Sequence, residues 1–128
     1  MAEKRYTEDH EWLVTEASGV ATVGITRFAQ EQLGELVFVE LPAIGWNGAT
    51  GEEAAVVESV KAAGGVNMPV AGTVIEVNSP VTDEPGKVNA DPEGQGWLFK
   101  IKMADPAQLA NLLDEAAYLA FLDARRTA

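Results

Sequence analysis

The chain has 128 residues, 47% of them hydrophobic, which is enough for one domain with a buried core but too few for two large domains. Asp and Glu number 20 against 9 Lys and Arg, and the resulting formal charge of -11 repels nucleic acid and anionic membranes. The absence of cysteine excludes disulfides and thiolate sites, and a single histidine argues against a histidine-ligated metal site. We therefore expect one domain over residues 1–128 whose acidity favours basic partner surfaces, unless it serves solubility alone.

The sequence also predicts where the protein works. No apolar stretch approaches the ~18–20 residues that a transmembrane helix needs. Residues 1–6 lack the apolar core of a signal peptide, and no Arg-rich amphipathic leader precedes the domain. We expect a protein of the bacterial cytoplasm with no membrane attachment.

Short strand-like segments, rich in Val, Ile, Phe and Trp and separated by Gly and Pro, dominate the chain. In the last one, the period of two places Trp97, Phe99 and Ile101 on one face and Lys100 and Lys102 on the other, which predicts one buried face and one solvent-exposed face. The number and spacing of the segments predict a mainly β fold, a β-sandwich or flattened barrel, rather than a parallel βαβ sheet. They cover residues 12–15, 20–25, 37–41, 54–60, 66–70, 73–77 and 97–102.

Two segments carry helix signals. Thr26 is a candidate N-cap for a short helix over residues 26–34, and Gly34 can end it because its missing Cβ permits a left-handed cap. Near the C-terminus, Asp105 and Pro106 are suited to the N-cap and the first helical position, and leucines follow at helical spacing. Asp114 can restart a helix, so the C-terminal segment forms either one helix or two short pieces.

The most informative segment centres on Lys61, which lies between two strand-like runs and has small neighbours. Gly64 and Gly65 are expected to reverse the chain, which predicts a hairpin with Lys61 at or near its tip. An exposed lysine on a rigid turn suits an enzyme that recognises a folded surface and acylates one amine, since amide formation turns the side chain into a long tether. On these residues alone, Lys61 can equally be an ordinary solvated turn residue.

The exact residues around this lysine resemble a known family. The string Val-Glu-Ser-Val-Lys-Ala at residues 57–62 is similar to the lipoylation site of glycine cleavage H proteins, as is the Pro-Val-x-Gly-x-Val that follows. Biotin carriers share the hairpin but usually set their lysine between two methionines, whereas Val60 and Ala62 flank it here. The resemblance covers about residues 4–123 in register, from the opening Tyr6–Trp12 to the Leu-rich C-terminal end.

The resemblance implies a lipoyl/biotinyl-carrier-like fold (a barrel-sandwich hybrid) and a carrier that catalyses no step itself. Lipoic acid would be held in amide linkage on Lys61 by a lipoate-attaching enzyme. The carrier would then take an aminomethyl group from the pyridoxal-phosphate glycine decarboxylase to the tetrahydrofolate-dependent aminomethyltransferase, and dihydrolipoyl dehydrogenase would reoxidise it. Presenting one tethered group raises its effective concentration at each enzyme in turn.

Three acidic residues are further candidates by their motif positions. In the family, the loaded arm folds into a surface cleft, and the resemblance gives Asp9 and Glu11 as the groups that would hold its amine. The alternative for Glu11 is an ordinary surface charge, and we expect His10 between them to be structural. We expect the lipoate-attaching enzyme to recognise Glu58, unless this residue is only a charge on the exposed side of a strand.

The chain also departs from the family pattern. The family usually has Ser-Asp where this chain has Gly64 and Gly65, so one acidic contact for the arm is missing and docking should be weaker. Gly48 and Ala54 replace larger apolar residues, and Trp46 is a candidate to refill the lost volume. Three alternatives stay open: a biotin-type carrier, an H-like protein that relays lipoyl groups to other enzymes, and an acidic β domain whose Lys61 is never modified.

Overall fold

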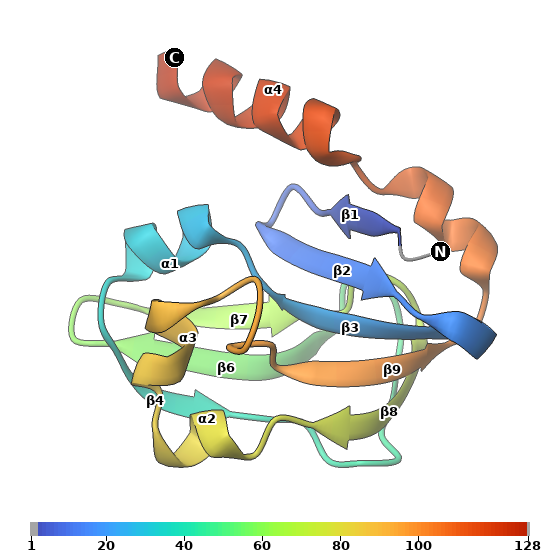
Figure 1. Ribbon diagram of the computed structural model, residues 1–128, viewed down its shortest axis with the longest axis horizontal. Helices are drawn as coiled ribbons and strands as arrows, with labels where there is room; N and C mark the ends of the chain where they lie inside the picture. The colour runs from blue at the N-terminus through green and yellow to red at the C-terminus, as the bar shows by residue number, and fades with distance from the viewer. Residues whose placement is uncertain (1–2, 128) are drawn as a thin grey trace.

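The computed structural model describes residues 3–127 and consists mainly of antiparallel strands (Figure 1). The larger sheet has the strand order β1-β2-β3-β9-β8-β5, and the smaller sheet has the order β4-β6-β7. The strands are β1 (Lys4–Tyr6), β2 (Glu11–Thr15), β3 (Val20–Ile25), β4 (Leu36–Glu40), β5 (Asn47–Gly48), β6 (Glu53–Ser59), β7 (Ala63–Asn67), β8 (Gly72–Val77) and β9 (Phe99–Met103). The helices are η1 (Ala17–Gly19), α1 (Arg27–Leu33), α2 (Pro80–Asp83), α3 (Gly86–Ala90), η2 (Pro106–Asn111) and α4 (Glu115–Thr127).

The main core lies between the two sheets. Val23 and Phe99 from the larger sheet and Val57 and Val66 from the smaller one are almost fully buried in the same cluster. Burial of each such side chain is worth about 1.5–3 kcal/mol, so the packing of one sheet on the other is a main source of stability. The predicted β-sandwich is confirmed, with two sheets that do not close into a barrel.

The predicted helix signals act as expected. The Thr26 hydroxyl accepts a hydrogen bond from the Ala29 amide in the first turn of α1, and Gly34 ends the helix at a φ of 81°. Asp105 caps η2 and Asp114 caps α4 in the same way. The C-terminal segment therefore forms two pieces, as the alternative with a restart at Asp114 predicts.

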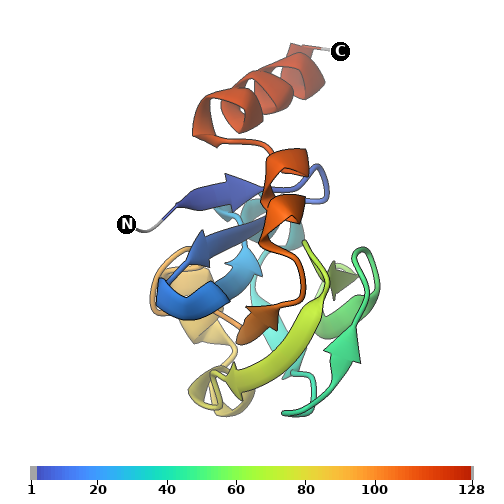
Figure 2. The same ribbon diagram turned by 90° about the vertical axis from the view of Figure 1, so that its right-hand side faces the viewer.

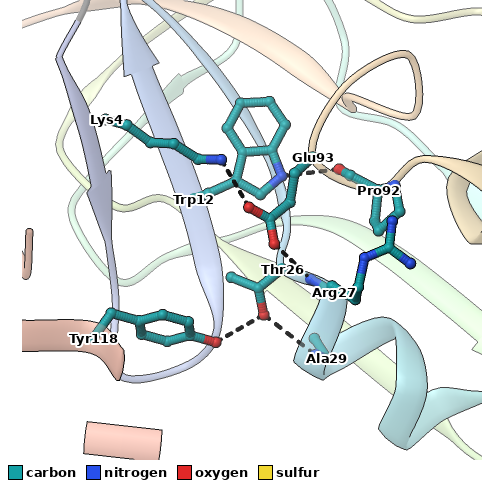
Figure 3. Close-up of polar contacts among 8 residues, drawn as sticks. All are labelled: Lys4, Trp12, Thr26, Arg27, Ala29, Pro92, Glu93 and Tyr118. Atoms are coloured by element: carbon teal, nitrogen blue, oxygen red, sulfur yellow. Dashed lines mark hydrogen bonds and ion pairs between the residues drawn. The ribbon is translucent and has the colours of Figure 1, made fainter. Parts of the chain in front are cut away.

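A second, smaller cluster attaches α4 to β1 and β2, and Figure 2 shows this helix beyond β1, away from the smaller sheet. The rings of Tyr6 and Tyr118 stack with their centroids 4.5 Å apart. The hydroxyl of Tyr118 lies 2.8 Å from the Oγ1 of Thr26, so the helix is tied to the start of α1 (Figure 3). Within residues 3–127, no helix is long and apolar enough to cross a membrane.

The segment before β9 is tied to the larger sheet by polar contacts that Figure 3 shows. Trp12 Nε1 donates to the carbonyl of Pro92 at 2.9 Å. Glu93 accepts from Lys4 Nζ at 2.7 Å and from the backbone amide of Arg27 at 2.8 Å. These contacts join β1, β2 and the first turn of α1. They therefore fix the N-terminal end of α1, next to the Thr26 cap.

Some expectations from the sequence were wrong. Trp97 lies before β9 and packs in the second cluster, and Lys100 Nζ lies 5.5 Å from its ring, so this tryptophan does not share the buried face of Phe99. The short helices α2 and α3 were not predicted. Pro80 is compatible with α2 because it stands at the helix start, where no backbone donor is lost. The short strands β1 and β5 were not predicted either.

Candidate functional site

Lys61 lies in the tight turn that joins β6 and β7, at the tip of the hairpin drawn below α1 in Figure 1. The turn is held by one side chain, because the Oγ of Ser59 accepts from the amides of Lys61 at 3.1 Å and Ala62 at 3.0 Å. The same hydroxyl donates to the Ala62 carbonyl at 3.1 Å, and the Ser59 amide donates to that carbonyl at 2.7 Å. Four hydrogen bonds within four residues fix the backbone on which Lys61 stands.

The two glycines after the lysine do not reverse the chain, which corrects the expectation from the sequence. Gly64 and Gly65 belong to β7 and pair with Val57 and Val56 of β6. Neither has a positive φ. The Ser59 hydroxyl satisfies the turn's amides, so the chain reverses over residues 59–62 without needing the conformational freedom of glycine.

The side chain of Lys61 is exposed and leans over the end of α1. Its Cε is so close to Gly34 that a Cβ placed on that glycine would lie 3.0 Å away. Lys61 forms no ion pair with any residue between 3 and 127. Its amine is therefore open to an approaching enzyme, as an amide-linked cofactor would require. Glu58 is exposed on β6, three residues before the lysine.

Glu11 is 2% exposed, so the alternative of an ordinary surface charge is wrong. Its carboxylate accepts from Thr7 Oγ1 at 2.7 Å and from the backbone amide of Asn67 at 3.1 Å. Burial raises the pKa of this carboxyl, and the two hydrogen bonds oppose that rise because they favour the charged form. A buried carboxyl of this kind is well placed to receive a cationic group.

Glu11 and Asp9 line one surface cleft of about 280 Å³, as the motif positions predict. Other lining residues come from distant segments and include Asn67, Met68, Gln108 and Leu112. Lys61 does not line the cleft, but β7 runs from the lysine turn to Asn67 at its edge. Residues 63 to 67 of an extended strand span about 13 Å, so a tether on Lys61 would have to lie back along β7 to reach Glu11.

His10 sits between the two acidic residues with a φ of 70°. Its Nδ1 lies 2.9 Å from the Tyr118 hydroxyl, and its ring packs against Phe28, so it joins the turn before β2 to α4 and to α1. This contact agrees with a structural role. Trp46 refills volume at Gly48, since a Cβ there would lie only 2.6 Å from the indole ring.

Thr7, Asn67 and Gln108 were not predicted from the sequence. Thr7 had a weak signal, because it stands four residues before Glu11 in the same opening motif. Asn67 and Gln108 had none, since their place in the cleft depends on how β7 and η2 pack against β2. The Gln108 side chain accepts from the Ala71 amide at 2.9 Å and so holds η2 at the cleft.

Comparison with known proteins gives the family. Residues 4–125 match the model of the glycine cleavage H-protein. The chain belongs to the glycine cleavage H-protein family. A glycine cleavage system H protein of Methylocella silvestris is 61% identical over 118 residues, covering 92% of this chain and 94% of that protein. One of Rhodospirillum rubrum is 51% identical over 122 residues, covering 95% and 97%.

The fold agrees with this assignment. A crystal structure of a glycine cleavage system H protein from Mycobacterium marinum superposes with a TM-score of 0.84 at 36% identity, covering 92% of this chain and 94% of that one. H proteins are the lipoyl carriers of the glycine cleavage system, so the family assignment makes this chain a lipoyl carrier and a component of that system.

Proposed function

We propose that Lys61 is the residue that carries lipoic acid, in amide linkage, and that residues 1–128 act as one carrier domain. The observation that carries the proposal is the exposed lysine, without an ion pair among the described residues, on a turn held by the Ser59 hydroxyl. A ligase can recognise such a turn as a rigid surface, and the fixed backbone adds no ordering cost when it binds. We propose that the lipoate-attaching enzyme also recognises the negative charge of Glu58, which is exposed beside the turn.

The carrier role follows from the family. When bound, the lipoyl group supplies a disulfide that accepts the aminomethyl group of glycine and becomes a dithiol after that group is passed on. We propose glycine decarboxylase, aminomethyltransferase and dihydrolipoyl dehydrogenase as partners, in the cytoplasm of a bacterium. The chain itself catalyses none of these steps; its residues present the group and shelter it.

The cleft at Glu11 is proposed as the resting place of the amine-bearing arm. A protonated amine that enters the cleft meets a carboxylate already held by Thr7 and Asn67, and the Asp9 carboxylate stands at the same cleft. Charge-assisted hydrogen bonds are about twice as strong as neutral ones, and their strength is greatest where water is excluded. Water would then reach the bound aminomethyl carbon less often.

The proposal is tested by loading the carrier with glycine decarboxylase and labelled glycine. Lipoylated protein, identified by intact mass, should retain label from the methylene carbon and none from the carboxyl carbon. A biotin-type carrier would differ in mass. A protein that relays lipoyl groups would lose its lipoyl mass to an acceptor enzyme and would retain no methylene label, which would contradict the proposed carrier role.

A further inference from the structure

Val60 immediately precedes Lys61 and is 79% exposed, more than any other large apolar side chain in the described part of the chain. A single exposed apolar residue is common on protein surfaces and means nothing by itself. Its position gives this one meaning, because Cα atoms of neighbouring residues are 3.8 Å apart and any protein that encloses the Lys61 amine must also cover Val60.

The turn presents these two side chains together. The Ser59 hydroxyl bonds the amides of Lys61 and Ala62 and the carbonyl of Ala62, which fixes the backbone around Val60. Valine is stiff about χ1, so little conformational freedom remains to be lost when a partner covers it. The turn thus presents the apolar side chain of Val60 in a preorganised position beside the reactive amine of Lys61.

The partner that this arrangement fits is the enzyme that acylates the bare lysine. Before modification, the amine stands only four methylenes from the backbone, so the active site of that enzyme must come close to the turn. After modification, the reacting sulfurs lie far out on the tether, and the later enzymes can engage them at a greater distance from Val60. Close cover of the turn is therefore required of the attaching enzyme above all.

We propose that Val60 is a specificity-determining contact for the lipoate-attaching enzyme, which covers it with an apolar surface while Lys61 enters the active site, and that Ser59 is a positioning residue for both. The inference rests on the proposed lipoylation of Lys61. The exposed Glu58 on the adjoining strand adds one anionic contact, so the enzyme surface should pair a shallow apolar depression with a cationic side chain.

The experiment measures lipoylation of the full apo-protein by purified lipoate-attaching enzyme with ATP and lipoate, at a series of carrier concentrations, by intact mass. Val60→Thr keeps the shape of valine but adds a hydroxyl that would be buried without a partner. We expect an apparent KM about tenfold higher with little change in kcat, since only recognition is weakened. Val60→Ile keeps an apolar side chain there and should keep the KM of the parent.

Ile44→Thr is the matched control, because Ile44 is 66% exposed in the loop before β5, outside both the turn and the cleft. It should behave as the parent. For the positioning residue, Ser59→Ala should raise the KM, and Ser59→Thr, which retains the hydroxyl, should restore it. Circular dichroism should show the same fold in all variants, since these side chains are exposed or lie at a turn.

The outcomes separate this inference from the proposed function. A parent that gains no lipoyl mass on Lys61 overturns the proposed function and this inference with it. A parent that is modified, with Val60→Thr showing the same KM as Ile44→Thr, leaves the proposed function standing and overturns the role of Val60. Equal KM values for Ser59→Ala and Ser59→Thr overturn the positioning role of Ser59.

Discussion

The lysine turn and the acidic cleft are built in opposite ways. The turn is made by four consecutive residues, and its hydrogen bonds all lie between Ser59 and Ala62. The cleft is assembled from segments far apart in sequence, with Glu11 held by Thr7 on one side and by Asn67 of another sheet on the other. The attachment point is thus local and exposed, while the place where the arm rests depends on the whole fold.

This difference predicts different consequences of mutation. Changes at the exposed turn should alter modification and leave the free energy of unfolding almost unchanged, because few packing contacts are lost. Changes at the buried carboxyl should alter stability as well as arm docking, since they leave the amide of Asn67 or the hydroxyl of Thr7 without its partner.

The largest effect is expected from Lys61→Arg. The guanidinium cannot form the amide, so lipoylation should be lost completely while the free energy of unfolding stays within about 0.5 kcal/mol of the parent. Intact mass after expression in a lipoylating host measures the first, and urea unfolding measures the second. Residual lipoyl mass on the variant would place the attachment elsewhere.

The next effect is a pH dependence at the cleft, tested with Glu11→Gln. Burial raises the pKa of Glu11 above its ordinary value of 4.5, so ionisation of this group destabilises the fold above the folded-state pKa, and the cost disappears as the pH falls below 4.5. The neutral variant escapes this cost. Its stability relative to the parent, from urea unfolding at each pH, should be highest near neutrality and should decline as the pH is lowered toward 4.5.

Glu16→Gln is a control of opposite sign. Hydrogen bonds from Thr22 and Lys100 lower the pKa of Glu16, so its carboxylate stabilises the fold above pH 4.5 and loses that contribution as the pH falls through the folded-state pKa. The variant should therefore gain on the parent as the solution is acidified. If the stabilities of Glu11→Gln and Glu16→Gln relative to the parent changed with pH in the same direction, burial would not raise the pKa of Glu11.

A smaller effect is expected where the chain departs from the family, at the two glycines of β7. A Cβ on Gly64 would meet Leu33 at an ordinary 3.7 Å, whereas one on Gly65 would lie 2.2 Å from Glu53 Oε1, a flexible side chain that can move. The double variant Gly64→Ser, Gly65→Asp should therefore fold. It should slow the loss of ammonia and formaldehyde from the loaded carrier by about two- to fivefold, because an added carboxylate on β7, along the path from Lys61 to the cleft, gives the amine a solvent-exposed ionic contact.

Gly64→Ser alone is the matched control, since it adds a side chain without the charge. A third variant that adds Glu53→Ala to the double variant removes the crowding of two carboxylates and should hold the amine at least as well. Ammonia release from the loaded proteins, without the transferase, is the measurement. Equal rates from the double variant and Gly64→Ser, with both folded by circular dichroism, would show that this position does not protect the arm.

The smallest effect concerns the net charge of -11. If the acidity steers the carrier to basic partner surfaces, the apparent KM of glycine decarboxylase for the lipoylated carrier should rise with ionic strength, because salt screens charges beyond about 10 Å at 0.1 M. Steady-state assays across a salt series measure it. A flat KM would show that the acidity serves solubility alone.

The sequence predicted the local features well. The Thr26 cap, the end of α1 at Gly34 and the Lys61 hairpin depend on neighbouring residues, and each was found. The prediction that Gly64 and Gly65 reverse the chain was wrong. The hydroxyl of Ser59 can bond in many ways, and only the folded turn shows which amides it binds.

Features that depend on tertiary packing could not be predicted. The Glu11 carboxylate is bonded to the amide of Asn67, 56 positions away, and Gln108, 97 positions away, lines the same cleft. The alternation before β9 placed Trp97 on the wrong face because the strand begins at Phe99, two residues later. The motif resemblance did find Asp9 and Glu11 as neighbours of one cleft, although it gave no physical reason for it.

Peptide mapping tests most directly whether Lys61 is the attachment point. Protein isolated from a lipoylating host is digested, and the lipoyl mass is located by tandem mass spectrometry. We expect it on the peptide that contains Lys61 and on no other. Lipoyl mass on Lys4, Lys87, Lys100 or Lys102, with Lys61 unmodified, would show that Lys61 is not the attachment point.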